Sequence, residues 1–278
     1  MTILPTVPLF PGGVAVSDLA VYDWEAVDGR CGGSPHLHTV SSEGYVVRSG
    51  SGAVHTITPA GIRVDRLHPG VVLWFSPGTV HRLVNDGDLR LLVVMQNAGL
   101  PEAGDAVLTF PSAVLDDPDA YARAAALPAD GEDDARGTAA RRRRDLAMEG
   151  YLELHAATLE HGSAPLAELH ARAARLVQSR TAEWRSLWES TVAAETDRTR
   201  RQLDALSQGL PGTLGDAAVA HAEQSVGERG FGMCGRLRTW NHPEAAHPGT
   251  AHDGTSHQDP TGDDPARQDP ARSTPTPS

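Results

Sequence analysis

The sequence predicts an α+β protein, in which an antiparallel β-barrel at residues 1–127 precedes an α-helical region at residues 138–240. Short β-rich runs separated by turn residues fill the first part. Ala, Leu, Glu and Arg at helical spacing fill the second. An acidic linker is expected between them at residues 128–137, and a degenerate five-residue repeat at residues 241–278 predicts a disordered tail.

The barrel is predicted from runs rich in Val, Ile, Thr and Tyr that are interrupted by Gly, Pro, Asp and Ser. No helical period interrupts them before about Met95. Many short, evenly spaced strands are typical of a sandwich or a small barrel. The predicted strands are Val14–Asp23, Gly44–Ser49, Ala53–Thr58, Gly61–Leu67, Val71–Phe75, Val80–Asn85 and Leu89–Gln96.

Helices are predicted after Pro111. Residues 117–127 begin with Asp-Pro-Asp, a helix start signal, and two longer helices are expected at residues 138–161 and from 165 to about 207. A further short helix is expected around residues 216–228. On the second long helix, three side chains within about one turn are expected to be buried, either within the helical region or at a dimer interface. These are Trp184, Leu187 and Trp188.

The composition excludes several kinds of chemistry. The 24 basic residues of this 278-residue chain are all Arg, so a Schiff base, a pyridoxal phosphate anchor and a phosphate-loop lysine are excluded. Cys31 and Cys234 lie too far apart to suggest a disulfide framework or a thiolate cluster, which fits a reducing compartment. No basic residue precedes Arg30, and no stretch approaches about 20 uninterrupted apolar residues. We therefore expect a cytoplasmic protein with no secretion signal and no membrane partner.

The charge of −12 is uneven and argues against nucleic acid as a partner. Residues 1–137 hold 8 Arg against 17 Asp and Glu, and an acidic surface repels phosphate backbones. The run Arg141–Arg144 is flanked by acidic residues, so we expect it to form a solvated helix face. The tail histidines His242, His247, His252 and His257 follow the five-residue repeat, which explains them more simply than metal handling.

Three histidines and one glutamate form the candidate site. His36 and His38 are two residues apart, so on a strand they project from the same face. Glu43 heads the next strand, and His81 follows a Ser-Pro-Gly-Thr-Val turn. Three imidazoles and one carboxylate inside a barrel suit one divalent ion of Fe, Mn, Ni, Zn, Co or Cu and leave one or two positions open.

Strand parity also predicts the surroundings of this site. Tyr45 and Val47 share the face of Glu43, and Leu83 shares that of His81, so these three are expected to line a substrate pocket. Either Trp74 or Phe75 lines the barrel as well. Surface positions are expected for the remaining polar side chains nearby, which are His55, His68 and Arg82.

Two segments, residues 32–50 and 70–85, resemble the paired motifs of the cupin superfamily. The first motif, HxH, four residues, Glu, six residues and Gly, is matched by His36, His38, Glu43 and Gly50. The second, Gly, five residues, Pro-x-Gly, two residues, His, three residues and Asn, is matched by Gly70, Gly78, His81 and Asn85. Two turn positions depart from the pattern: Arg30 stands where a leading Gly is usual, and Ser76 where Pro is usual.

The resemblance implies a cupin-type barrel, or double-stranded β-helix, with His36, His38, Glu43 and His81 as metal ligands. It implies a small-molecule dioxygenase, an oxidoreductase in which Glu43 doubles as a catalytic base. A non-redox isomerase or lyase and a non-catalytic binder of small molecules remain alternatives, because cupin barrels host all three. Members of the superfamily commonly pair, so a homodimer is expected to which residues 138–240 contribute.

Overall fold

The computed structural model describes residues 9–128 and 132–241. These residues belong to one compact unit, residues 1–243, and a second unit comprises residues 244–278. The predicted tail from His242 on, with its four histidines, lies outside the described residues, as do residues 129–131 of the predicted linker. Within the described ranges, no helix is long and apolar enough to cross a membrane.

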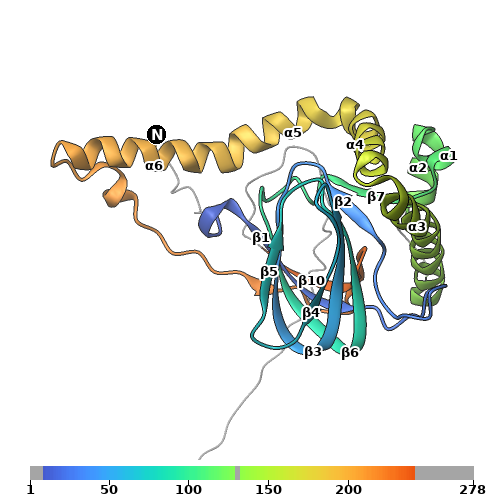
Figure 1. Cartoon of the computed structure of the whole chain (residues 1–278). Coiled ribbons are helices and arrows are strands. Elements are labelled where there is room, and N and C mark those ends of the chain that lie inside the picture. The colour runs from blue at the N-terminus through green and yellow to red at the C-terminus, as the bar shows by residue number, and fades with distance from the viewer. Residues whose placement is uncertain (1–8, 129–131, 242–278) are drawn as a thin grey trace, which may run out of the picture. The chain divides into compact units, whose positions relative to one another are not determined.

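An antiparallel sheet forms the N-terminal half, and with the helices that follow it confirms the predicted α+β class (Figure 1). Two strands of 16 residues, β3 and β6, dominate it, and each joins two runs that were predicted as separate strands. At their bend, Gly50 has φ +76°, and a Cβ there would lie 2.2 Å from the Asp88 carbonyl oxygen. The strands are β1 (Ala15–Val21), β2 (His36–His38), β3 (Glu43–Thr58), β4 (Gly61–Leu67), β5 (Val72–Phe75), β6 (Val80–Met95) and β7 (Ala106–Leu108).

The strand order is β4-β3-β6-β1, while β5 pairs with β3 and β2 pairs with both β6 and β7. Side chains of alternate residues therefore meet inside the barrel. The barrel core contains Tyr45, Val47, Val54, Leu83, Leu91 and Val93.

Three C-terminal strands complete the sheet. β10 (Gly235–Asn241) pairs with β1 over five residue pairs, and β8 (Glu223–Gln224) and β9 (Gly230–Phe231) pair with β10. The short helix predicted around residues 216–228 is therefore wrong, and the helical region expected up to residue 240 ends earlier. Glycines at positions 227, 230 and 232 interrupt helical continuity, and the free edge of β1 offers backbone partners instead.

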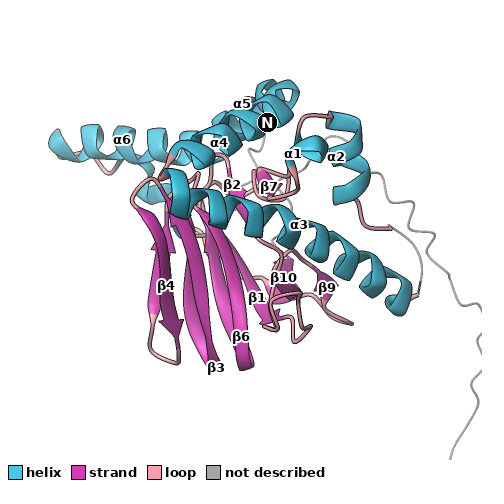
Figure 2. Cartoon of the chain, turned by 45° about the vertical axis from the view of Figure 1, so that its right-hand side comes forward, coloured by secondary structure: helices cyan, strands magenta, loops and turns pink. Residues whose placement is uncertain are grey.

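The helices cover one end and one side of the sheet (Figure 2). Their second core joins Leu37, Val107 and Leu108 of the barrel to Met148, Leu169 and Trp184 of the helices. The helical elements are η1 (Pro11–Gly13), α1 (Ser112–Leu115), α2 (Pro118–Ala125), α3 (Asp133–His161), α4 (Ala164–Val177), η2 (Gln178–Arg180), α5 (Thr181–Trp188), η3 (Glu189–Ala193), α6 (Ala194–Ser207) and η4 (Gly212–Asp216).

Helix α3 begins inside the segment predicted as a linker. Its first turn contains Asp133 and Asp134, whose negative charges suit a helix N-terminus. Gly150 lets α3 approach the barrel, because a Cβ there would lie 2.3 Å from the Thr109 carbonyl oxygen. The acidic composition thus belongs to a helix start and not to a spacer.

Arg143 and Arg144 of α3 are buried, so the prediction of a solvated face for Arg141–Arg144 is wrong for these two. Arg144 donates from Nη1 to the Trp24 carbonyl at 2.7 Å and from Nη2 to the Glu25 carbonyl at 2.9 Å. The carbonyls of this irregular loop need donors that the sheet does not supply. The Arg144 guanidinium therefore holds this loop against α3, whereas Arg143 donates to the Ala125 and Gly232 carbonyls.

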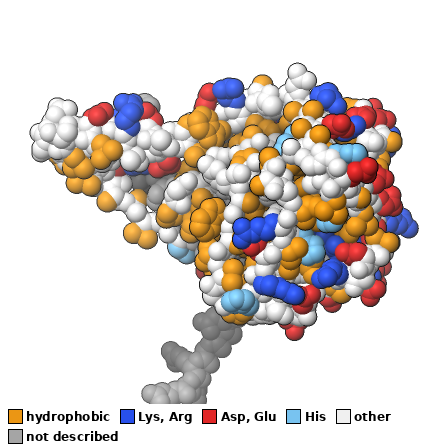
Figure 3. All heavy atoms as spheres, viewed as in Figure 1, with side chains coloured by type: hydrophobic (Ala, Val, Ile, Leu, Met, Phe, Trp, Pro, Cys, Tyr) orange, Lys and Arg blue, Asp and Glu red, His pale blue; other side chains and the backbone are white. Residues whose placement is uncertain are grey.

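The side chains expected to be buried on the second long helix separate into two groups. Trp184 is buried within the chain and Leu187 is partly buried, whereas Trp188 is 40% exposed, so for Trp188 the expectation of a dimer interface stays a prediction. The π-helical turn η3 follows Trp188 directly, and α6 has no buried residue. Hydrophobic side chains are exposed along the rod formed by α5 and α6, among them Leu203 and Leu206 (Figure 3).

Replacing Arg144 with Met should lower the free energy of unfolding by about 2–4 kcal/mol, because the partly buried carbonyls of Trp24 and Glu25 lose the Arg144 donor. Urea denaturation measures this change. Arg142→Met is the matched control on the same helix, since Arg142 is exposed and its loss should change stability by no more than about 0.5 kcal/mol. Equal effects of the two substitutions would contradict the role of Arg144.

Candidate metal centre

Four side chains from three strands converge inside the barrel. His36 and His38 lie on β2, Glu43 starts β3 and His81 lies on β6. The pairing of β2 with β6 places His36 opposite His81. All four residues are buried, and one ligand atom from each lies within 4.8 Å of the others.

Neighbouring ligand atoms have the separations of groups that share one ion. Nε2 of His81 lies 3.1 Å from Nε2 of His36 and 3.0 Å from Oε2 of Glu43. Nε2 of His38 lies 3.4 Å from the same Glu43 oxygen. Adjacent ligands at about 2.1 Å from a metal lie about 3.0 Å apart in octahedral geometry and about 3.4 Å apart in tetrahedral geometry.

Each imidazole is oriented through its other nitrogen. Nδ1 of His36 donates to the Ser34 carbonyl at 2.9 Å, and Nδ1 of His81 donates to the Thr79 carbonyl at 3.1 Å. Nδ1 of His38 donates to Oδ1 of Asp105 at 2.7 Å. Because these acceptors require a proton on Nδ1, the neutral rings present unprotonated Nε2 atoms to the centre.

The electrostatics of the site match a cation position. Burial, and then His81 and His38, lower the pKa of His36 well below its ordinary value. Burial alone would raise the pKa of Glu43, but His81 and His38 hold it well below its usual range. Burial opposes the charge on His38 as well, yet the hydrogen bond to Asp105 and the nearby Glu43 carboxylate raise its pKa to about 10. The buried Glu43 carboxylate and the Nε2 lone pairs of the histidines thus favour a positive charge at the centre of the site.

The donor set therefore fits a metal ion. Oε2 of Glu43 is buried and has no regular hydrogen bond to any described residue. Nε2 of His36 and Nε2 of His81 face each other as acceptors, which repel unless a proton or a cation lies between them. Three nitrogens and one carboxylate oxygen are the ligand types of a borderline divalent ion.

Around this centre the barrel is lined with aromatic and aliphatic side chains. Tyr45, Val47 and Leu83 are all buried in the barrel core, on the face that the alternation of side chains along each strand predicted. The Phe75 ring lies 4.3 Å from the His81 ring and 5.6 Å from the Tyr45 ring, measured between centroids. Trp74 points outward and is 74% exposed, so Phe75 is the residue that lines the barrel.

One residue of the site, Asp105, was missed by the sequence reasoning. Its side chain is fully buried, and Oδ2 accepts a hydrogen bond from the Ser41 amide at 3.0 Å. It lies in a loop after β6, 67 positions from His38 and outside both motifs. In the sequence, Asp105 is distinguished only by its position after Gly104 and before the apolar strand at residues 106–108. This position is a weak indication of a role in the site.

The prediction of a surface position for Arg82 is wrong. Arg82 projects away from His81 as parity predicts, yet it is fully buried instead of forming a surface charge. Its Nη1 donates to Oδ2 of Asp28 at 2.5 Å, because the loop before β2 covers that face of the sheet. Among the other histidines, His68 is exposed as predicted, whereas His55 is half-buried and burial lowers its pKa to about 4.

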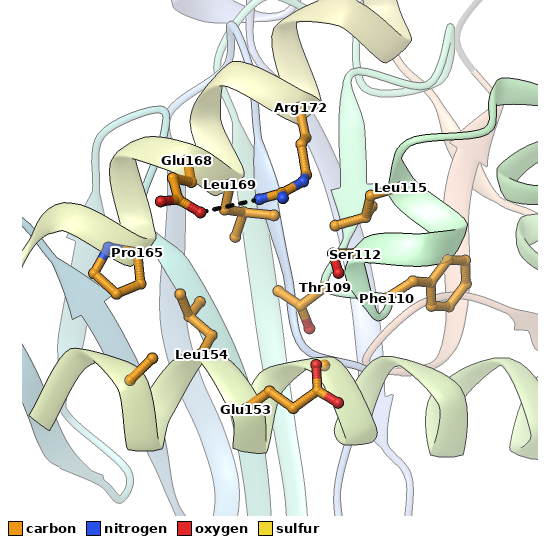
Figure 4. A pocket seen from close by; sticks show the side chains of 12 residues that line it. Thr109, Phe110, Ser112, Leu115, Glu153, Leu154, Pro165, Glu168, Leu169 and Arg172 are labelled. Carbon is orange, nitrogen blue, oxygen red and sulfur yellow. Dashed lines mark ion pairs between the residues drawn. The ribbon is translucent and has the colours of Figure 1, made fainter. Parts of the chain in front are cut away.

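A separate hollow of about 160 Å³ lies between α1, α3 and α4 (Figure 4). Leu115, Leu154 and Leu169 line it, and Arg172 pairs with Glu168 at its rim. Its lining shares no residue with the metal centre, and none of the predicted site residues faces it.

Comparisons with known proteins agree with the geometry. Residues 24–95 match the family model described as the cupin domain, and this segment holds all four candidate ligands. A comparison with curated proteins finds no match.

Solved structures similar to the chain cover about a third of it. Pac13 from Streptomyces, described as a nucleoside dehydratase, is 16% identical over 35% of this chain and 69% of its own, with a TM-score of 0.27. A double-stranded β-helix protein from Klebsiella pneumoniae is 19% identical over 34% of this chain and 77% of its own, with a TM-score of 0.27. A cupin protein from Bacteroides fragilis is 21% identical over 31% and 65%, with a TM-score of 0.23.

The family match covers the strands that carry the site. Both motifs keep their ligand residues, and these residues meet inside one antiparallel barrel. Residues 24–95 thus form a cupin domain, and this domain carries all four candidate ligands.

Proposed function

We propose that the chain is a metal-dependent cupin enzyme in which His36, His38, Glu43 and His81 hold one divalent ion of Fe, Mn, Ni, Zn, Co or Cu. The observation that carries this proposal is the convergence of four ligand atoms within 4.8 Å, with each imidazole oriented through Nδ1. When bound, such an ion supplies Lewis acidity and, for a redox-active metal, electron transfer with oxygen. Four protein ligands leave one or two positions open on a five- or six-coordinate ion.

Small-molecule dioxygenase chemistry is the activity that we propose for this site. Phe75, Tyr45 and Leu83 make the surroundings apolar and aromatic, which favours a small, largely apolar substrate and excludes water. Glu43 is in position to accept a proton from a substrate hydroxyl or thiol, and the lowered pKa keeps its carboxylate ionised for this role. The buried Tyr45 hydroxyl is in position to orient a polar substrate group.

A non-redox isomerase or lyase is the second candidate, and one observation favours it. The buried hydroxyl of Tyr45 and Oε2 of Glu43 both lack a regular hydrogen bond to any described residue. Burial, and then the Glu43 carboxylate, raise the pKa of Tyr45 well above its ordinary value, so the hydroxyl keeps its proton. A proton-holding phenol beside a carboxylate is an acid–base pair that needs no oxidant.

Metal analysis followed by oxygen uptake separates these two candidates. The protein, purified without a His-tag, should contain about one equivalent of iron, nickel or copper and should consume oxygen with a member of a polyphenol and thiol panel. One equivalent of zinc with no oxygen uptake would instead support the isomerase or lyase. Absence of any bound metal after loading with each ion would overturn the proposed site.

Two histidine variants belong to the same experiment. His38→Ala removes a ligand and should lower metal content at least tenfold without unfolding the barrel, because the apolar core does not include that imidazole. His68→Ala is the matched control, since His68 is exposed and outside both motifs. Full occupancy of His38→Ala would contradict the ligand assignment.

Tyr45→Phe tests the role of the buried hydroxyl. Because this hydroxyl has no regular hydrogen bond to a described residue, its removal should leave the free energy of unfolding unchanged or raise it by up to about 1 kcal/mol. Turnover of the substrate found in the panel should fall about 10- to 100-fold, while metal content stays at one equivalent. Unchanged turnover would remove Tyr45 from the proposed substrate site.

A further inference from the structure

The helical layer contacts two loops that lead directly to metal-centre residues. In Figures 1 and 2, α4 lies at the same end of the sheet as β2 and β7. One loop, residues 76–79, joins β5 to β6 and ends two residues before His81. The other loop, residues 96–105, joins β6 to β7 and ends at Asp105. The helical residues that make these contacts, His170 and Arg180, lie outside both cupin motifs.

His170 of α4 holds the first loop. Its Nε2 donates to the Gly78 carbonyl at 2.7 Å, and the Gly78 amide donates to the His38 carbonyl at 2.8 Å. The next residue, Thr79, supplies the carbonyl that orients His81. Gly78 has φ +84°, and a Cβ there would lie 3.3 Å from His170 Nε2, so this position favours glycine against the imidazole.

Arg180, in the η2 turn after α4, holds the second loop. Its guanidinium donates to the Gly104 carbonyl at 3.0 Å and to the Ala103 carbonyl, directly before Asp105. The same guanidinium lies 5.3 Å from the centroid of the buried Trp184 ring. This contact fixes the guanidinium against the helical core.

Asp105 transmits this arrangement to the metal centre. Its two carboxylate oxygens engage His38 Nδ1 and the Ser41 amide, and its carbonyl accepts from the Thr39 amide and hydroxyl, each at 2.9 Å. Any shift of residues 103–105 therefore moves the acceptor that orients His38. Partners of this kind commonly change metal affinity 10- to 100-fold when they are lost.

We propose that His170 and Arg180 are positioning residues of the metal centre, which hold from the helical layer the two loops that orient His81 and His38. The helical region then has a function inside the barrel, and this inference rests on the metal site proposed above. Arg180 acts through Asp105, and His170 acts through the Gly78–Thr79 backbone.

Titration of the metal-free full chain with Co²⁺ tests the proposal, with affinity and the visible absorption spectrum of bound Co²⁺ as readouts. His170→Leu and Arg180→Met should each weaken Co²⁺ binding about tenfold and change the spectrum, because ligand orientation changes. His170→Gln should restore both, since its amide can donate to the same carbonyl. Arg175→Met is the matched control, because Arg175 pairs with Asp116 at the surface of α4.

A double-mutant cycle identifies the route from Arg180. Arg180→Met combined with Asp105→Asn should bind Co²⁺ no more weakly than Asp105→Asn alone, because both changes act on one contact. The proposal would be overturned, with the metal site unaffected, if the affinity losses of Arg180→Met and Asp105→Asn multiplied in the double variant. It would also be overturned if both His170→Leu and Arg180→Met kept the wild-type Co²⁺ affinity and spectrum. Failure of the wild-type chain to bind Co²⁺ would instead overturn the proposed metal site. If Arg180→Met does not fold, Arg180→Lys, which retains one donor, carries the same comparison.

Discussion

The structure depends on one constraint: nitrogen lone pairs and a carboxylate face one another in a buried space. His36, His38 and His81 each use Nδ1 for a hydrogen bond, so their Nε2 atoms cannot turn away from the centre. The carboxylate of Glu43 adds a negative charge that is buried away from water. Such a group of acceptors is costly without a cation among them. The surrounding strands and loops supply the acceptors for the three Nδ1 atoms, and these hydrogen bonds keep the Nε2 atoms close together despite the energetic cost. Such an arrangement is expected of a site that binds a cation.

The ligand set and the barrel could be predicted because they depend on local spacing. Two-residue alternation places His36 and His38 on one face, and turns at fixed distances bring Glu43 and His81 toward them. Burial of Arg82 could not be predicted in this way. Parity gives its direction correctly, but whether that face meets water depends on a loop and on α3, which are packed there by non-local contacts. Asp105 was missed for the same reason, because its partner His38 lies 67 positions away.

Local composition misled where tertiary partners decide the conformation. The acidic residues around Asp133 resemble a linker, yet they begin α3. The chain was expected to be helical around residues 216–228 and within the region up to residue 240, yet the open edge of β1 pairs with β10 there. Arg143 and Arg144 carry charges typical of a surface and instead are buried and donate to backbone carbonyls of loops. For β10 and the two arginines, backbone groups elsewhere in the chain needed partners, and that need outweighs local preference.

X-ray absorption at the metal edge of the loaded protein tests the central claim most directly, because it reports the ligands themselves. The account predicts a first shell that contains three imidazole nitrogens and a carboxylate oxygen at about 2.0–2.2 Å, with the outer-shell scattering characteristic of histidine rings. Only one or two further ligands, which are oxygen atoms of solvent, complete this shell. A first shell made mainly of water oxygens, with one imidazole or none, would contradict it.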